Sequence, residues 1–242
     1  MSTLQHRYQA IRHRIRQACE QANRNEDEVR LLAVSKTKPA DMVQTCYAQG
    51  QRSFGENYLQ DGIEKVESLQ NLQGIEWHFI GPLQSNKTRA VATHFHWLET
   101  LDRIKIARRL DEQRPPELPP LNVLIQVNIS GEEQKAGVAL DQVSDFADEI
   151  QRLERLNLRG LMCIPEAVDL QSPAGVTTLK QQFDQMKQLF DQLRLTCPQV
   201  DTLSMGMSAD LELAIAAGST EVRIGTDIFG ARSPRQEQRD TS

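Results

Sequence analysis

The strongest constraint on the fold is a regular alternation of short apolar segments with longer stretches of helical periodicity. The apolar segments are typical of buried β-strands, and each crossover is long enough to connect parallel strands. Eight strands are predicted, at 30–36, 52–56, 75–81, 97–101, 121–129, 158–165, 202–207 and 221–228. Eight is the number that closes an α/β barrel of about 250 residues. A doubly wound open sheet shares this pattern, but we expect a single (β/α)8 TIM barrel.

Helices are predicted before the first strand and between the strands. An extra N-terminal helix at 2–23 has an apolar stripe opposite an arginine-rich face, for which exposure to solvent is the favoured interpretation. Further helices are expected at 39–49, after Asn57, at about 140–155, at 176–195 and at 209–217. Ser85 and Asp102 are predicted N-caps of two more. We therefore expect one domain, 1–242, with a polar tail at about 231–242.

Charge and composition argue against several classes of protein. The formal net charge of −5 does not suit nucleic-acid binding through bulk charge. No apolar run approaches the ~20 residues of a membrane helix, and no secretory signal is visible. The cysteines, Cys19, Cys46, Cys163 and Cys197, lack a Cys-x-x-Cys spacing and a nearby histidine cluster. We expect free thiols, no metal site and a cytoplasmic location.

The first predicted strand ends in a lysine, Lys36, and Pro39 then opens a helix. Burying an ammonium group is costly unless the group is paired or neutralised. A lowered pKa would make this amine a nucleophile toward carbonyl groups, as in Schiff-base lysines. The alternative is a lysine whose ammonium group reaches solvent at the strand end, and the strand alone favours that alternative.

Two glycine-containing loops are expected on the same rim as Lys36. In a closed barrel the first strand lies beside the eighth, and the loops after strands seven and eight often hold a phosphate. Here these loops are residues 204–208, which include Met207 and Ser208, and residues 225–227, which begin Gly225-Thr226. Ser208 is predicted at the start of a helix, where its hydroxyl and the helix amides can face an anion. Taken singly, Ser208 as a plain N-cap and the glycines as turns are the simpler explanations.

Arg223 is predicted to point into the barrel, since Val222 and Ile224 on either side of it would face the helices. An inward arginine needs an acceptor, and the ring nitrogen of pyridoxal 5′-phosphate is one. The alternative is a structural arginine paired with Glu221 or another carboxylate. A lysine for the aldehyde, an arginine for the ring nitrogen and a serine-glycine-threonine nest for the phosphate together predict a pyridoxal 5′-phosphate site.

An arginine at the ring nitrogen bears on the chemistry. It cannot give up its proton, so the ring stays neutral and is a weak electron sink. A racemase also needs two bases, and no obvious second base accompanies Lys36 in the sequence. A binding protein is therefore favoured over an amino-acid racemase. A Schiff-base aldolase without cofactor is a third possibility, although the predicted phosphate nest favours the other two.

The sequence also resembles a known family, the pyridoxal phosphate homeostasis proteins of the YggS or PROSC type. The matching stretches are residues 32–39, 54–58, 77–87, 160–162, 204–208 and 222–226, within a resemblance that runs over about 4–231. The resemblance implies a single barrel like the N-terminal domain of alanine racemase. It implies pyridoxal phosphate held as an internal aldimine on Lys36, Arg223 facing the ring nitrogen, and Ser208, Gly225 and Thr226 taking the phosphate.

The expected function is intracellular pyridoxal phosphate homeostasis, by buffering or delivery, without established turnover. Asn57 and His78 are expected to line the ring, although a satisfied core histidine is slightly favoured for His78. Met207 is counted with the cofactor-binding loop. No catalytic residue and no metal ligand is assigned. The expected partners are pyridoxal phosphate and apo-enzymes that receive it, with no nucleic acid or membrane. The chain is expected to be a monomer, and a pyridoxal-phosphate enzyme such as a small racemase is the alternative.

Overall fold

Eight parallel strands close into a barrel in the computed structural model, which describes residues 3–132 and 134–231. The strands follow one another around the barrel in chain order, and β1 completes the ring by pairing with β8. They are β1 (Arg30–Val34), β2 (Ser53–Glu56), β3 (Glu76–Phe79), β4 (Trp97–Leu101), β5 (Leu121–Val127), β6 (Leu156–Cys163), β7 (Thr202–Ser204) and β8 (Glu221–Ile224). The predicted (β/α)8 barrel is confirmed.

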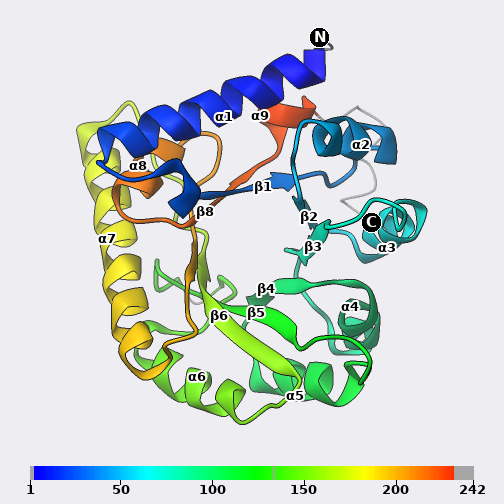
Figure 1. Ribbon diagram of the computed structural model, residues 1–242. Coiled ribbons are helices and arrows are strands. Elements are labelled where there is room, and N and C mark those ends of the chain that lie inside the picture. Colours follow the sequence, from blue (N-terminus) through cyan, green and yellow to red (C-terminus); the bar gives the residue numbers. More distant parts are fainter. Residues whose placement is uncertain (1–2, 133, 232–242) are drawn as a thin grey trace.

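Helices form a ring outside the strands (Figure 1). They are α1 (Thr3–Gln21), α2 (Ala40–Ala48), α3 (Leu59–Ser68), α4 (Thr88–His94), α5 (Ile104–Gln113), α6 (Val143–Gln151), α7 (Pro173–Thr196), α8 (Leu211–Ala216) and α9 (Thr226–Phe229), with short 3₁₀ turns η1 (Glu26–Glu28), η2 (Ser85–Lys87) and η3 (Leu140–Gln142). The extra N-terminal helix α1 is confirmed, and it packs against α8 and α9. The predicted polar tail lies outside the described residues from 232 onward.

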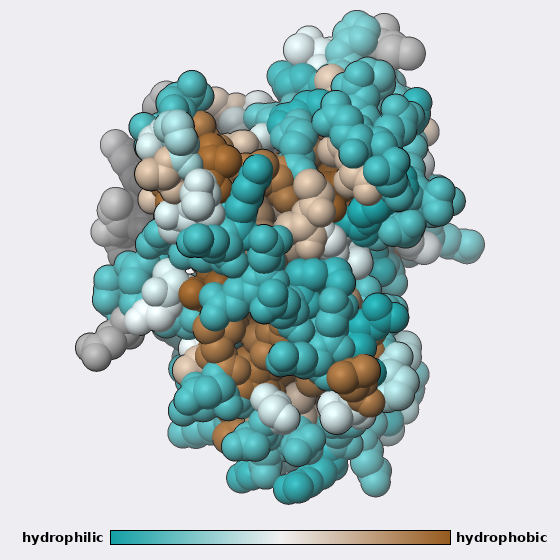
Figure 2. Space-filling view, turned by 90° about the vertical axis from the view of Figure 1, so that its left-hand side faces the viewer, coloured by the Kyte–Doolittle hydropathy of each residue, from teal (hydrophilic) through white to brown (hydrophobic). Residues whose placement is uncertain are grey.

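The helices turn their apolar faces toward the barrel. Figure 2, which looks at the side carrying α7 and α8, shows a largely hydrophilic surface with hydrophobic residues visible mainly in gaps. Val222 and Ile224 belong to the core between strands and helices, whereas Trp97, Leu124 and Met162 form a separate small cluster. This separation follows from the alternation of side chains along each strand. It confirms that Arg223 points to the inside of the barrel.

Three predicted helix starts are wrong. Ser85 opens the turn η2, and α4 begins only at Thr88. The carboxylate of Asp102 accepts from Arg103 rather than from helix amides, and the helix starts at Ile104. Ser208 also lies three residues before the first residue of α8. A strong capping residue is thus not by itself enough to place the first residue of a helix.

The last strand is shorter than predicted. β8 ends at Ile224, and residues 226–229 form the helix α9 instead of continuing the strand. Ile228 and Phe229 bury their side chains from this helix, which explains the apolar pattern that was interpreted as strand. The change turns the chain away from the barrel directly after Gly225.

The sequence predicts that the arginine face of α1 is exposed to solvent, but part of this face contacts the rest of the protein. Arg14 donates to Glu212, to Asp227 and to the carbonyl of Ser208, and so connects α1 to α8, α9 and the loop after β7. Arg7 donates to the carbonyl of Ile228 at 2.7 Å. These contacts fix the first helix across the β7 and β8 side of the barrel.

Two further observations concern the cysteines and the lengths of the helices. All four cysteines are buried and free. Among the residues that the structure describes, no helix combines the length and the apolar character needed to cross a membrane.

Candidate functional site

Lys36 lies two residues beyond the end of β1, at the carboxyl end of the barrel. Val34 pairs in register with Gly55, so Lys36 is level with Asn57 on the neighbouring strand end. On the other side β1 pairs with β8, and Ala33 is opposite Ile224. Leu32 and Val34 share one face of β1 because side chains alternate along a strand, and Lys36 lies in the turn that follows them. The half-buried lysine therefore stands at the mouth of the barrel, where active sites of this fold are found.

A buried group of charges lies behind Lys36, on β2 and α3. The Lys65 ammonium donates to Glu56 Oε1 at 2.8 Å, to Asp61 Oδ2 at 2.9 Å and to the carbonyl oxygen of Ser35 at 2.8 Å. Burial raises the pKa of Glu56 to about 7, against the opposing charge of Lys65. Sequence analysis did not single out this group. Its members are 4 to 30 positions apart in the chain. The one local signal was a lysine, Lys65, next to apolar residues of α3.

Arg223 is almost fully buried and points inward from β8. One of its terminal nitrogens donates to both the carbonyl and the hydroxyl oxygen of Ser204, each at 2.8 Å, and the other donates to the carbonyl of Cys163 at 2.8 Å. No bond to Glu221 is recorded, so pairing with that carboxylate is not what holds the guanidinium. Arg223 is fixed by the ends of β6 and β7, directly beneath the loops of the rim.

The two glycine-containing loops approach each other at the rim. Arg14 links them, because it binds the carbonyl of Ser208 in one loop and Asp227 beside the other. A Cβ at Gly225 would come 3.3 Å from the carbonyl oxygen of Val34, so this glycine permits close approach of the loop to β1. Ser208 is half-buried and Thr226 exposed.

The helix-start environment predicted for Ser208 is not present. Asp210 occupies the position before α8, and its Oδ1 accepts the backbone N–H of Met207 at 2.6 Å. Met207 itself is 40% exposed at the rim, unusual for a large apolar side chain. Ser208 therefore lies in the loop itself and not at the N-terminus of α8.

Asn57 and His78 lie at different depths. Asn57 is level with Lys36, and its side-chain oxygen is buried without a recorded hydrogen-bond partner. His78 pairs with Gly55 and is thus one inward layer below Lys36. It is fully buried and stacks on Trp97, with ring centroids 5.0 Å apart. Asn57 is placed to meet a ligand at the rim, whereas His78 belongs to the barrel interior.

A chain of buried polar groups runs through that interior. His78 Nδ1 lies 2.7 Å from Glu99 Oε1, and Ser204, which binds Arg223, donates to Glu99 Oε2 at 2.9 Å. Burial lowers the pKa of His78 to about 4, so the imidazole is neutral at pH 7. Sequence analysis missed Glu99, although a carboxylate at an inward strand position is a usable signal. Glu99 connects the histidine to the arginine of the rim.

Glu221 adds a second buried carboxylate to this chain. Burial and the neighbouring Glu99 raise the pKa of Glu221 to about 7. His78, Glu99 and Glu221 each bring one possible ligand atom within 4.8 Å of the others. However, Arg30 lies 3.5 Å from Glu221, and the charge of Arg223 acts on Glu99. These two cations balance the carboxylates and disfavour a further cation.

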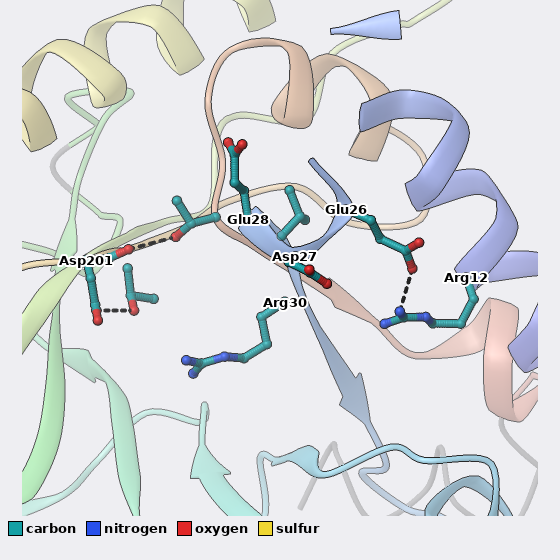
Figure 3. Close-up of a pocket in the computed structure, with 9 residues that line it drawn as sticks. Arg12, Glu26, Asp27, Glu28, Arg30 and Asp201 are labelled. Atoms are coloured by element: carbon teal, nitrogen blue, oxygen red, sulfur yellow. Dashed lines mark hydrogen bonds and ion pairs between the residues drawn. The ribbon is translucent and has the colours of Figure 1, made fainter. Parts of the chain in front are cut away.

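A polar cleft of about 400 Å³ lies at the opposite, amino end of the barrel. Arg12 reaches toward Glu26 on one side of it and Asp201 lies on the other, with Arg30 between them (Figure 3). The cleft is lined by Arg12, Glu26, Asp27, Glu28, Val29, Arg30, Asp201, Thr202 and Thr220. It contains no residue of the predicted site, which lies at the carboxyl end.

The chain is similar to known proteins over nearly its whole length. The family described as "Alanine racemase, N-terminal domain" matches residues 7–233. A relative named pyridoxal phosphate homeostasis protein from Haemophilus influenzae is 53% identical over 234 residues, covering 95% of this chain and 96% of the relative. A protein of the same name from Escherichia coli is 51% identical over 237 residues, 96% of this chain and 98% of the relative.

Solved structures agree with this grouping. The structure of PipY from Synechococcus elongatus, described with PLP bound, is 33% identical, covers 89% of this chain and 100% of its own, and has a TM-score of 0.76. Alanine racemase from E. faecalis has a TM-score of 0.70 at 14% identity, over 94% of this chain and 59% of the racemase, which shows a shared fold alone. The near relatives are named for homeostasis and not as enzymes. The chain therefore belongs to the family of pyridoxal phosphate homeostasis proteins, built on the barrel of the alanine racemase N-terminal domain.

Proposed function

We propose that the protein binds pyridoxal 5′-phosphate covalently through Lys36 and serves in intracellular homeostasis of this cofactor, by buffering or delivery. One observation carries the proposal: a half-buried lysine just beyond the end of β1 and a buried arginine on the adjacent β8 lie at the same end of the barrel. The family supports it, since its near relatives bear this functional name and the PipY structure is described with PLP bound.

The residues at the rim fit the cofactor. Lys36 supplies an amine for the aldehyde, and Arg223 supplies N–H groups for the ring nitrogen. Asn57 has a buried side-chain oxygen without a recorded partner, which is the kind of group that a ligand satisfies. Gly225 brings backbone close to β1, and with Met207, Ser208 and Thr226 it would hold the phosphate.

The cofactor, when bound, supplies a reactive aldehyde and an electron-withdrawing ring. The protein's own residues limit what that ring can do. Arg223 would face the ring nitrogen as a hydrogen-bond donor and not as an acid, because a guanidinium group donates N–H hydrogen bonds without giving up a proton. Two buried titratable groups are already engaged, Glu56 behind the rim with Lys65, and His78 in the barrel interior with Glu99. This arrangement suits holding the cofactor better than proton transfer at a substrate carbon.

Three further features belong to the same proposal. The chain acts as one domain, 1–242. It acts as a monomer in the cytoplasm, and apo-enzymes that need pyridoxal phosphate receive the cofactor from it. Size-exclusion chromatography with light scattering would test the monomer, and activation of an apo-enzyme by the loaded protein would test delivery.

The first experiment is absorption spectroscopy of the purified protein with pyridoxal phosphate, followed by borohydride reduction and peptide mass spectrometry. We expect a yellow protein and a reduced pyridoxyl group on Lys36. A protein that stays colourless with added cofactor, or that carries the group on another residue, would overturn the proposal. Turnover of an amino acid that is lost in Lys36→Ala would instead favour a racemase-like enzyme.

A further inference from the structure

Both chain neighbours of Lys36 are bound to the charges behind the rim. Ser35 donates its hydroxyl to Glu56 Oε1 at 2.5 Å, and its carbonyl oxygen accepts from Lys65. The backbone N–H of Thr37 donates to Asp61 Oδ2 at 3.2 Å. We call Glu56, Asp61 and Lys65 the Lys65 cluster. It holds the backbone immediately before and immediately after the lysine of the site.

The Lys65 cluster is costly to build, which suggests a specific role. The Lys65 and Glu56 side chains are 5% and 0% exposed, and removing both charges from water opposes folding. Its three recorded hydrogen bonds use all three N–H groups of the ammonium. Replacing a buried ion pair by apolar residues of similar volume is often neutral or stabilising, so stability does not by itself account for the cluster.

The backbone that the cluster holds is strained. Thr37 has a φ of +63°, in the left-handed region that a β-branched residue rarely adopts. Such conformations persist only where surrounding contacts enforce them, and they gather at functional sites. The bond from Asp61 to the Thr37 N–H is one such contact. It keeps the chain turning sharply just after Lys36.

Close packing of α3 places the cluster where it can act. A Cβ on Gly62 would lie 2.8 Å from the ring of Phe95 and 3.1 Å from Glu56 Cβ, so only glycine lets the helix come this near to β2. Asp61 and Lys65 are four residues apart and therefore lie on the same side of α3. Both thus face the loop that carries Lys36.

We propose that Lys65 is a positioning residue for Lys36: with Glu56 and Asp61 it fixes Ser35 and Thr37, so that the amine of Lys36 is held toward the barrel mouth. This inference rests on the proposed function of Lys36. The inference gives Lys65 a role in the rate at which Lys36 captures the cofactor covalently. It gives Lys65 no role in the affinity for the rest of the cofactor.

The test separates covalent capture from binding. The rate of capture of pyridoxal phosphate is measured by stopped-flow absorbance and by borohydride trapping on Lys36. Affinity is measured with pyridoxine 5′-phosphate, which has a hydroxymethyl group in place of the aldehyde. For Lys65→Met we expect capture to slow by about 10- to 100-fold, because small misplacement of a reacting group costs that much. The affinity for pyridoxine 5′-phosphate should remain close to that of the wild type.

Asp61→Asn is the second variant, since it leaves the contact between Lys65 and Glu56 in place and weakens the links of Asp61 to Thr37 and to Lys65. We expect a smaller slowing of capture, in the same direction. Glu64→Gln is the matched control: this exposed residue of α3 contacts Gln60 on its own helix, and its capture rate should be that of the wild type. Thermal unfolding of each variant gives its folded fraction, and each capture rate is corrected for that fraction.

The outcomes are distinguishable. If the wild type is not labelled on Lys36, the proposed function fails and this inference fails with it. If the wild type is labelled but Lys65→Met and Asp61→Asn capture the cofactor as fast as Glu64→Gln, only the inference fails. If the pyridoxine 5′-phosphate affinity falls together with the capture rate, the cluster merely supports the site and the positioning role is wrong. Should Lys65→Met not fold, Asp61→Asn decides.

Discussion

The two ends of the barrel are both rich in charge, but they use it differently. At the amino end the cleft residues Arg12 and Glu26 are paired with each other, and their side chains are 35% and 24% exposed. At the carboxyl end Arg223 is buried and Lys36 half-buried, beside a strained Thr37. The polar cleft and the proposed site therefore lie at opposite ends of the barrel. What distinguishes the proposed site is charge held beside strained backbone, an arrangement that opposes folding.

The largest contrast is expected for Lys36→Ala. Removal of the amine should abolish the borohydride-trapped pyridoxal phosphate at position 36, where the proposed covalent bond forms. Lys105→Ala, which removes an exposed lysine of α5, should retain full labelling. Peptide mass spectrometry after reduction checks both. Labelling of another lysine in Lys36→Ala would show that covalent capture does not depend on Lys36 alone.

Arg223→Met should weaken both binding and stability. We expect an affinity loss of about 10- to 100-fold, as for a charge-assisted hydrogen bond, measured by titration with pyridoxal phosphate. Loss of the bonds to Ser204 and Cys163 should also lower the free energy of unfolding by about 3 kcal/mol in urea. Arg108→Met, at an exposed pair with Glu149, should change it by less than about 1 kcal/mol. Equal losses of unfolding free energy in Arg223→Met and Arg108→Met would contradict the role given to the burial of Arg223.

Glu221 should make stability depend on pH. Its folded pKa of about 7 lies above its ordinary 4.5, so the folded state holds a proton that the unfolded state loses first. Its contribution is therefore lost as the pH rises from about 4.5 to 7, by roughly 2 to 3 kcal/mol. Glu221→Gln keeps the neutral form, so it should gain stability relative to the wild type over this range.

The difference between wild type and Glu221→Gln isolates this group from its neighbours. Burial lowers the pKa of His78 to about 4, so that histidine destabilises the fold in the opposite direction, as the pH falls below 6.5. Burial also raises the pKa of Glu99, whose charge faces Glu221, while Arg30 faces it from β1. Urea unfolding at pH 5, 6, 7 and 8 checks the prediction. A constant difference over these four values would show that Glu221 does not titrate as described.

The smallest effect is expected at the amino-end cleft. Glu26→Gln removes the charge that pairs with Arg12 and Arg16, both partly exposed. Such pairs contribute less than about 1 kcal/mol, and less still at high salt, because water and ions screen them. Capture of pyridoxal phosphate should be unchanged. A marked loss of capture would show that the two ends of the barrel are coupled.

Local patterns predicted much of this protein, because they depend on residues close in the chain. Alternation along 222–224 correctly placed Arg223 inside the barrel. The apolar run before Lys36 correctly predicted a strand, but that strand ends at Val34, two residues before the lysine. The capping signals at Ser85, Asp102 and Ser208 failed. Each of these side chains, or the loop around it, has tertiary contacts that a local rule does not include.

The sequence by itself determined the number and order of the strands, the inward and outward faces, and the candidates Lys36 and Arg223. Only the tertiary structure decided that the sheet closes, that Ser204 and Cys163 hold Arg223, and that the Lys65 cluster binds both neighbours of Lys36. The reason is physical. Periodicity is a property of neighbouring residues, whereas closure and buried polar networks join groups such as Glu99 and Ser204, 105 positions apart.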